Sequence, residues 1–235
     1  MDIALIGYGN MGRLVKLRAE EANHHVVVIV NEAHADLPPE QLAETLRIAD
    51  VAVDFTVADA VERNVAACML AGIPIVVGTT GWNDRFAEIK GLVDENNGSL
   101  VYGSNFSVGV NLFFRIADYA ADLISKFPEY EPFIEEQHHS QKRDSPSGTA
   151  LKLGSVVAKH YPQQPPIAST RAGNIPGTHR VGFDGVADQI LLEHIARTRE
   201  GFALGAIMAA EWIIGKTGVN EFSAVMDELI ARRSE

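Results

Sequence analysis

The segment Ile3–Gly12 has the sequence IALIGYGNMG, a short apolar run followed directly by a glycine-rich turn. The run is typical of a buried strand, and the spacing Gly7-x-Gly9-x-x-Gly12 is typical of a dinucleotide-binding βαβ unit. Gly7 permits a tight turn, Gly9 lets the backbone approach a pyrophosphate, and Gly12 allows the next helix to pack closely. The N-terminus of that helix would face the phosphate charge. The alternative is a turn that is rich in glycine only for packing.

Strand-like and helix-like segments alternate along residues 1–107. The strand-like runs are continuously apolar, as expected for a parallel sheet covered on both faces. The expected strands are Ile3–Ile6, Val26–Val30, Val51–Phe55, Ile73–Val77 and Leu100–Tyr102, and the clearest helices are Met11–Ala22 and Ala58–Ala71. This order predicts an α/β fold with a Rossmann-like, doubly wound parallel sheet.

The alternation ends near residue 107, and the following block has α+β character. Strands are expected at Tyr130–Gln137, Ile167–Arg171 and Ala187–Thr198, and helices at Leu112–Ser125 and from about Ser147 to His160. Two helical stretches, Ala203–Ile214 and Phe222–Ile230, follow. Periodicity alone leaves open whether the middle block is a domain inserted before a returning C-terminal tail.

Composition restricts the partners of the chain. Its 235 residues are 46% hydrophobic, and 31 acidic residues against 20 basic ones give a net charge of −11. Such a surface repels phosphate backbones and anionic lipid, so neither nucleic acid nor a membrane is expected as a partner. No apolar stretch approaches the about 20 residues of a membrane span, and no signal peptide is recognisable, so we expect a cytoplasmic protein. The single cysteine, Cys68, excludes a disulfide framework, and its apolar setting predicts a buried, inert thiol.

Polar loops follow several of the expected strands, at the edge where open parallel sheets bind ligands. Asn31 and Glu32 stand where an acidic residue binds ribose hydroxyls. Glu32 would oppose a 2′-phosphate, but Asn31 in the leading position leaves the choice between NADH and NADPH open. Either small-residue loop, Gly78–Gly81 or Ser104–Ser107, could by itself be an ordinary turn. The candidate cofactor-binding residues are Gly7, Tyr8, Gly9, Asn10, Met11, Gly12, Asn31, Glu32, Gly78, Thr79, Thr80, Ser104, Asn105, Phe106 and Ser107.

The strongest cluster of chemical groups is the segment Glu135–Thr149, EEQHHSQKRDSPSGT. It gathers positive charge in an otherwise acidic protein, from His138, His139, Lys142 and Arg143. Lys142 can donate a proton, and the histidines can stabilise charge near neutral pH. The alternatives are a solvated loop and a zinc site, but no third ligand stands at metal-site spacing, so no metal is expected.

A helix is predicted to begin inside this segment. Ser145 would be its N-cap and Pro146 its first residue. The amides of Ser147, Gly148 and Thr149 would then point out of the first turn and form an anion site. A small, doubly negative substrate would fit this arrangement.

These motifs together resemble the 4-hydroxy-tetrahydrodipicolinate reductase family, also called dihydrodipicolinate reductases, of lysine and diaminopimelate synthesis. The resemblance covers essentially the whole chain. Its ordered matches are the glycine turn, Gly78–Gly81, Ser104–Asn111, His138–Thr149, Arg171–Gly173, Gly177–His179 and Phe202–Ala206. The glycine turn is one residue shorter than the common family form, and Gln137, Arg143 and Ser145 replace the usual residues, which leaves the proposed chemical groups unchanged.

The resemblance implies a reductase that uses NADH or NADPH to reduce a small dicarboxylate. It implies a dinucleotide-binding domain, residues 1–107, to which residues 206–235 return, and a substrate-binding and oligomerisation domain, residues 108–205, in a homotetramer. Carried over by position, His138 is the catalytic histidine and Lys142 the proton donor. The residues that would bind the substrate are His139, Ser147, Gly148 and Thr149.

Two other interpretations compete with this one. A Rossmann dehydrogenase acting on a semialdehyde would commonly need a cysteine nucleophile, but Cys68 lies in the middle of a predicted helix. A dinucleotide-sensing protein without catalysis would have no reason to retain the cluster His138–Thr149.

Overall fold

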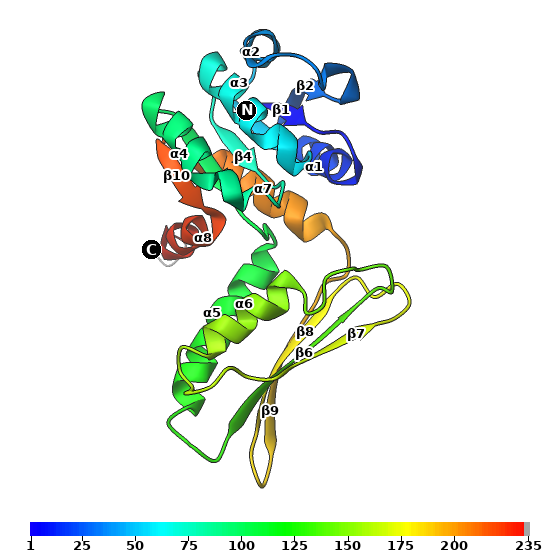
Figure 1. Cartoon of the computed structure of the whole chain (residues 1–235), viewed down its shortest axis with the longest axis vertical. Helices are drawn as coiled ribbons and strands as arrows, with labels where there is room; N and C mark the ends of the chain where they lie inside the picture. The colour runs from blue at the N-terminus through cyan, green and yellow to red at the C-terminus, as the bar shows by residue number, and fades with distance from the viewer. Residues whose placement is uncertain (233–235) are drawn as a thin grey trace. The chain divides into compact units, whose positions relative to one another are not determined.

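The structure is a computed structural model that describes residues 1–232 and divides the chain into two compact units (Figure 1). The first unit contains Met1–Val108 and the chain from Glu200 onward, and the second contains Gly109–Arg199. The return to the first unit therefore begins at Glu200 instead of the expected residue 206. The reason is that α7, Glu200–Ile213, is one continuous helix that packs on the first unit.

A six-stranded parallel sheet forms the centre of the first unit. Its strand order is β10-β5-β4-β3-β1-β2. The strands are β1 (Asp2–Ile6), β2 (His25–Val30), β3 (Val51–Asp54), β4 (Ile75–Val77), β5 (Ser99–Tyr102) and β10 (Gly218–Glu221). The five expected strands are confirmed. The sixth, β10, was not predicted because its sequence GVNE contains no apolar run and it lies at the edge of the sheet.

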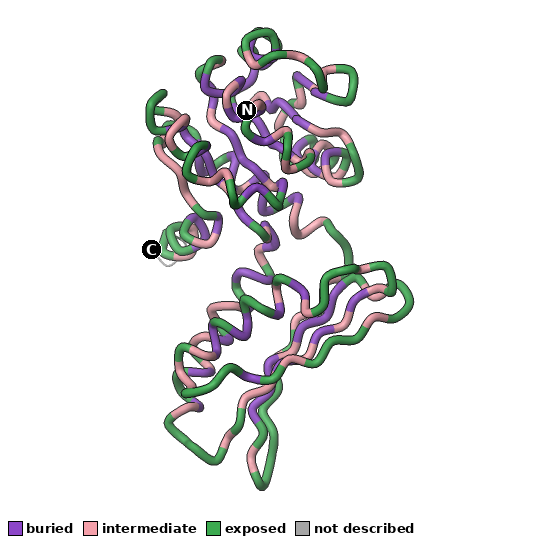
Figure 2. The backbone as a smooth tube through the Cα atoms, viewed as in Figure 1, coloured by how far each residue is buried: buried purple, intermediate pink, exposed green. Residues whose placement is uncertain are grey.

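Helices cover both faces of this sheet and create two separate cores, as in a doubly wound fold. One face carries α2 (Pro39–Leu46), α3 (Val61–Ala71) and α4 (Phe86–Glu95). The other carries α1 (Asn10–Glu21), α7 and α8 (Phe222–Arg232). Figure 2 shows that buried positions follow the strands between these layers. Cys68 lies fully buried in the first core, and burial raises the pKa of its thiol, which confirms the expected inert cysteine.

The second unit is a four-stranded mixed sheet with two helices on one face. The strand order is β7-β6-β8-β9, and only β6 and β7 are parallel. The strands are β6 (Glu131–His138), β7 (Ile167–Arg171), β8 (Thr178–Asp184) and β9 (Gln189–Ile195), and the helices are α5 (Val108–Ile124) and α6 (Gly148–Val157). Apolar side chains of both helices pack on β6 and β8. Strand β8 was not predicted, since Arg180 and Gly182 interrupt its apolar pattern.

No helix in residues 1–232 is long and apolar enough to cross a membrane.

Candidate active site

The strands of the first unit end at one common edge. The register pairs Ile6 with Asp54, Asp54 with Val77, Val77 with Tyr102, and Tyr102 with Glu221. The loops that follow these residues therefore lie along the carboxyl edge of the sheet. The strand order reverses between β1 and β3, which is where doubly wound folds bind their ligands.

The glycine turn after β1 contains two glycines that packing requires and one that it does not. Gly7 has a φ of +93°, and a Cβ there would lie 2.3 Å from the carbonyl oxygen of Phe55. A Cβ on Gly12 would lie 2.1 Å from the carbonyl oxygen of Gly7. Gly9, in contrast, is the N-cap of α1, and a Cβ there would meet no atom within 4 Å. The turn thus combines a tightly packed base with an open face.

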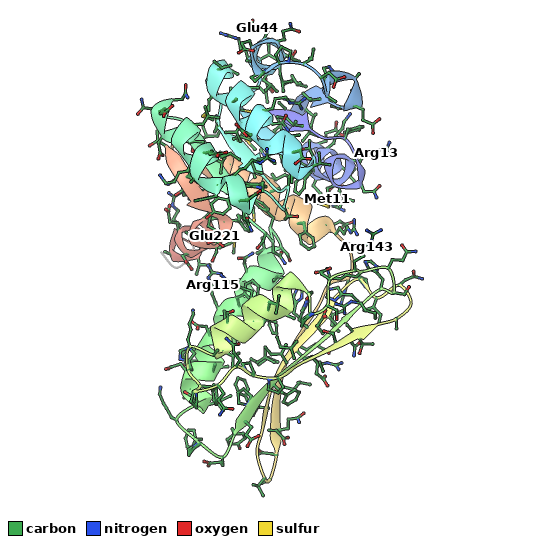
Figure 3. All side chains as sticks on the ribbon, viewed as in Figure 1. Met11, Arg13, Glu44, Arg115, Arg143 and Glu221 are labelled. Carbon is green, nitrogen blue, oxygen red and sulfur yellow. The ribbon has the colours of Figure 1, made fainter. Side chains whose placement is uncertain are left out.

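The other residues of this turn differ in exposure. Asn10 is exposed, whereas Tyr8 and Met11 are half-buried and pack against the core beneath α1. Figure 3 shows Met11 and Arg13 on this helix. Because Gly9 has no side chain, α1 has no side-chain cap, and its first-turn amides are suited to receiving a phosphate.

The residues after β2 have separate roles. Gly7 donates its amide hydrogen to the carbonyl of Val30 over 2.9 Å, so Asn31 follows at the same edge as the glycine turn. The Asn31 side chain accepts a hydrogen bond from the Ala33 amide over 3.0 Å and contacts His34 Nδ1 over 3.1 Å. Glu32, the next residue, is exposed.

A cavity of about 260 Å³ lies at the ends of β4, β5 and β10. It is lined by Thr79, Thr80, Gly81, Trp82, Asn83, Tyr102, Gly103, Ser104 and Glu221. Three of these, Thr79, Thr80 and Ser104, were predicted from the sequence. Glu221 (Figure 3) was not, because β10 itself was not recognised.

Asp54 links the loops of this edge and was missed by sequence reasoning. It is fully buried and accepts hydrogen bonds from Thr56 Oγ1 and Thr79 Oγ1, both over 2.7 Å, and from Asn64 Nδ2 over 2.8 Å. Burial raises the pKa of Asp54, and these hydrogen bonds oppose the rise. The carboxyl group therefore ties the turn after β3 to the turn after β4.

Phe106 was predicted to bind the cofactor, but its side chain belongs to the core of the first unit. Its ring is buried against Phe222, with ring centroids 4.6 Å apart, and lies edge-on to Phe55. Only the backbone of Phe106 is therefore suited to contact a ligand. In the same loop, Asn105 Oδ1 accepts a hydrogen bond from the Ser107 amide over 2.8 Å.

The histidine–lysine cluster lies wholly within the second unit, where it joins β6 to α6. His138 is the last residue of β6 and is 8% exposed, whereas His139 is half-buried. Lys142 Nζ pairs with Asp144 Oδ1 over 2.8 Å. The Lys142 hydrogen bond is the main cause that lowers the pKa of Asp144. Arg143 lies exposed on the same loop (Figure 3).

The predicted start of the helix was wrong by two residues. The N-cap of α6 is Ser147, whose Oγ accepts a hydrogen bond from the Ala150 amide over 3.2 Å, and Ser145 lies outside the helix. The Ser147 amide donates to Glu136 Oε1 over 3.3 Å. One of the amides expected to bind an anion therefore already binds a carboxylate of the protein.

Four buried polar side chains surround the end of β6. Glu136 is 1% exposed; its Oε1 forms an ion pair with Arg171 over 2.6 Å, and its Oε2 faces His138 Nδ1. His179 is 5% exposed and lies with its Nε2 3.2 Å from Ser147 Oγ. The His138 and His179 rings meet edge-on with centroids 5.0 Å apart.

Burial lowers the pKa of both histidines. For His138, the charge of Glu136 opposes the effect, while for His179 the pKa falls to about 4. Both rings are therefore neutral near pH 7.

Three of these groups have the composition of a metal site. Ligand atoms of Glu136, His138 and His179 lie within 4.8 Å of one another. Spacing in the sequence could not reveal the third ligand, because it comes from β8 and the other two from β6. However, Arg171 already neutralises Glu136, and the positive charge of Lys142 acts on both histidines. These two cations oppose the binding of a divalent metal.

Comparisons with known proteins agree across both units. The family model described as "Dihydrodipicolinate reductase, N-terminus" matches residues 1–106, and the one described as "Dihydrodipicolinate reductase, C-terminus" matches residues 109–226. The 4-hydroxy-tetrahydrodipicolinate reductase of Christiangramia forsetii is 36% identical, over 97% of this chain and 99% of the relative. That of Archaeoglobus fulgidus is also 36% identical, over 91% and 94%.

Solved structures show the same fold. A dipicolinate-bound dihydrodipicolinate reductase from Paenisporosarcina sp. TG-14 superposes with a TM-score of 0.76 at 22% identity, over 94% of this chain and 97% of that chain. An amine dehydrogenase from Mycobacterium smegmatis gives 0.62 at 10% identity, over 95% of each chain. Since both family models match and full-length relatives exceed a third identity, the chain belongs to the dihydrodipicolinate reductase family.

Proposed function

We propose that the protein reduces 4-hydroxy-tetrahydrodipicolinate, or the dihydrodipicolinate formed from it by loss of water, to tetrahydrodipicolinate with NADH or NADPH. The proposal places it in lysine and diaminopimelate synthesis. The observation that carries it is the junction of β6 and α6, where His138, Lys142 and the helix start Ser147–Thr149 occupy one loop of a chain in this family.

The residues present fit a bound dinucleotide. Gly9 leaves the face of the glycine turn open, and α1 begins without a side-chain cap. The cavity beyond β4 and β5 offers hydroxyls and backbone for the nicotinamide end. When bound, the dihydronicotinamide supplies a hydride for the substrate ring.

The second unit supplies the proton donor and the residues that bind the substrate. Lys142 holds a proton that it donates to the carbon next to the one receiving hydride. His139, Gly148 and Thr149 bind the substrate carboxylate, with Ser147 behind them as the helix cap. Because Asp144 pairs with Lys142, the substrate must compete with this carboxylate for the lysine.

We further propose that Glu32 decides the cofactor preference. Asn31 is committed to capping the turn after β2, and the Glu32 carboxylate would repel a 2′-phosphate. We therefore expect NADH to be preferred over NADPH, and Glu32→Gln to narrow the difference.

The test is a coupled assay that follows loss of absorbance at the dihydronicotinamide band. The substrate is made in the cuvette by the condensing enzyme that precedes this step, and NADH and NADPH are supplied in turn. Oxidation that depends on both the substrate and the protein is expected. If the purified protein oxidises neither cofactor, the proposed reaction is wrong.

A further inference from the structure

Two family motifs of the second unit have no role in the proposed reaction, Arg171–Gly173 and Gly177–His179. They lie at the end of β7 and the start of β8, the two strands that flank β6. The register pairs His138 with Arg171 and Glu136 with His179. Both motifs are therefore neighbours of Glu136 and His138 in the sheet.

We propose that Glu136 is a positioning residue that fixes the tautomer and orientation of His138, with Arg171 and Ser147 as its anchors. The proposal rests on the proposed function insofar as His138 takes part in the reaction. It assigns a role to both of these second-unit motifs, because Arg171 contacts Glu136 and His179 contacts His138 and Ser147.

The ionisation of Glu136 is the first step of the argument. Burial acts to raise its pKa, but hydrogen bonds from Arg171 and Ser169 and the charge of His138 outweigh burial and lower the pKa to about 2. Glu136 is therefore a carboxylate at any pH at which the enzyme works. An ionised carboxylate only accepts hydrogen bonds.

The contact between Glu136 and His138 then decides which ring nitrogen carries the proton. Glu136 Oε2 faces His138 Nδ1, and a carboxylate that only accepts hydrogen bonds favours a hydrogen on the nitrogen opposite it. Nδ1 therefore carries the hydrogen. Since His138 is neutral near pH 7, its Nε2 is left as an acceptor.

Glu136 is itself held from two sides. Arg171 donates from Nη2 to Glu136 Oε1 over 2.6 Å and from the same nitrogen to the Asp144 carbonyl over 2.6 Å. The Ser147 amide donates to the same carboxylate oxygen over 3.3 Å. The carboxylate therefore links the end of β7, the catalytic loop and the start of α6, so that His138 cannot turn independently of them.

His179 completes the arrangement from β8. Ser147 Oγ accepts from the Ala150 amide, so its own hydrogen is available for His179 Nε2, 3.2 Å away. The His179 ring is thereby fixed edge-on against His138. Gly177 is the residue directly before β8. A Cβ at this position would lie 3.1 Å from His138 Nε2, so glycine leaves space around that nitrogen.

The first experiment compares two matched substitutions on adjacent residues of β6. Glu136→Gln keeps the shape, but its amide group faces Nδ1 and favours the opposite tautomer. We expect kcat to fall at least about 100-fold, the scale of a misplaced general acid or base, with little change in the KM for NADH. Glu135→Gln is the control, because Glu135 is partly exposed and pairs with Arg180 instead. It should leave kcat unchanged.

The second experiment observes the tautomer directly and does not depend on activity. In ¹⁵N-histidine-labelled protein, the wild-type His138 signals should show hydrogen on Nδ1, and the Glu136→Gln signals hydrogen on Nε2. Assignment is made with His138→Gln. Hydrogen on Nε2 in the wild-type protein overturns the proposal, and this measurement stands even if Glu136→Gln does not fold.

A double-mutant cycle separates positioning from general structural damage. If Glu136 acts through His138, Glu136→Gln should cost little further activity in a His138→Gln background. Losses that simply multiply would overturn the positioning role. If His138→Gln alone were fully active, the catalytic assignment of His138 would fail, while the tautomer measurement would still decide the role of Glu136.

Discussion

Two buried carboxylates of this protein behave in opposite ways because their donors differ. Asp54 receives hydrogen bonds from neutral side chains, and burial raises its pKa. Glu136 is as well buried, but it faces the positive charge of Arg171 and its pKa falls to about 2. At Glu136 the hydrogen bonds from Arg171 and Ser169 and the nearby positive charges outweigh burial, whereas the neutral donors at Asp54 do not. At the residue scale, the pKa of each buried carboxyl group therefore depends on whether its hydrogen-bond donors are neutral or charged.

Lys142 is the residue whose removal should affect chemistry most directly. We expect Lys142→Ala to lower kcat at least about 100-fold while the affinity for NADH barely changes, because a general acid contributes about 10²–10⁴. Steady-state kinetics and cofactor titration measure the two effects. Lys152→Ala, an exposed lysine on α6, is the matched control. A loss confined to cofactor binding would refute the assignment.

His179 should make stability depend on pH. Its pKa is lowered from 6.5 to about 4, so the folded state disfavours the proton that the unfolded chain accepts. Its contribution is present above about pH 6.5 and is lost as pH falls toward 4, a loss of about 3 kcal/mol at 1.36 kcal/mol per pKa unit. The groups that act on it are His138, Glu136, His194 and Lys142.

Urea unfolding between pH 7 and pH 4.5 measures this effect. The free energy of unfolding should fall less steeply with acid in His179→Gln than in the wild-type protein. Parallel curves for the two proteins would mean that His179 does not titrate in this range.

At the scale of elements, one short turn serves packing and binding through different glycines. Gly12 lies where α1 approaches the turn, with no room for a Cβ, while Gly9 faces open space. In the sequence motif alone, Gly9 and Gly12 are told apart only by position. The packing of α1 on β1 shows that their roles differ.

Serine substitutions should separate the two roles. Gly12→Ser forces a side chain into the Gly7 backbone, and we expect a loss of about 1–3 kcal/mol of stability. Gly9→Ser should keep the melting temperature, since serine is a favoured N-cap, but weaken NADH binding at least about tenfold by occupying the phosphate position. Thermal unfolding and fluorescence titration measure the two properties. Equal destabilisation by both substitutions would contradict this division.

Asp54 should couple the loops after β3 and β4. In Asp54→Asn, a carboxamide nitrogen would face donors that now bond to the carboxylate, so we expect a loss of about 1–3 kcal/mol and weaker cofactor binding. Adding Asn64→Asp returns an acceptor opposite the new donor and should recover part of the loss. Calorimetry on the single and double variants tests this. A single variant as stable as the parent would show that the network is dispensable.

At the scale of the whole molecule, the second unit exposes apolar side chains on α5 and on the edge strand β9. Tyr119 is 72% exposed on α5, and Leu191 and Ile195 are 47% and 56% exposed on β9. An apolar edge strand is a liability unless another surface covers it. We therefore propose that β9 forms part of a contact surface in the homotetramer that the family resemblance implies.

We therefore expect a particle of about four times the 25.5 kDa of one chain. Light scattering coupled to size exclusion measures it. Leu191→Asp combined with Ile195→Asp should yield smaller species, because two buried charges would oppose association. Ile48→Asp, at an exposed position of the first unit, is the control and should leave the mass unchanged. A wild-type monomer at micromolar concentration would refute the proposed assembly.

Local patterns of the sequence were sufficient for much of the fold. The strands β1 to β5 and helix α1 were predicted because each depends on an apolar run or a periodic face within its own residues. The glycine turn, the loops after β4 and β5, and the segment His138–Thr149 were found because their chemistry is contiguous. The strands β8 and β10 and the cap at Ser147 were missed, since each depends on a neighbour distant in the chain.

By itself, the sequence determined the doubly wound first unit, the family, and the loop that carries Lys142 and His138. Only the tertiary structure decided that Glu136, Arg171 and His179 surround His138, and that Asp54 joins two loops of the other unit. The physical reason is that a periodic pattern is encoded within one segment, whereas a side-chain contact across strands depends on which strands become neighbours and in what register. Here β6 lies between β7 and β8, and that order follows from packing the whole unit.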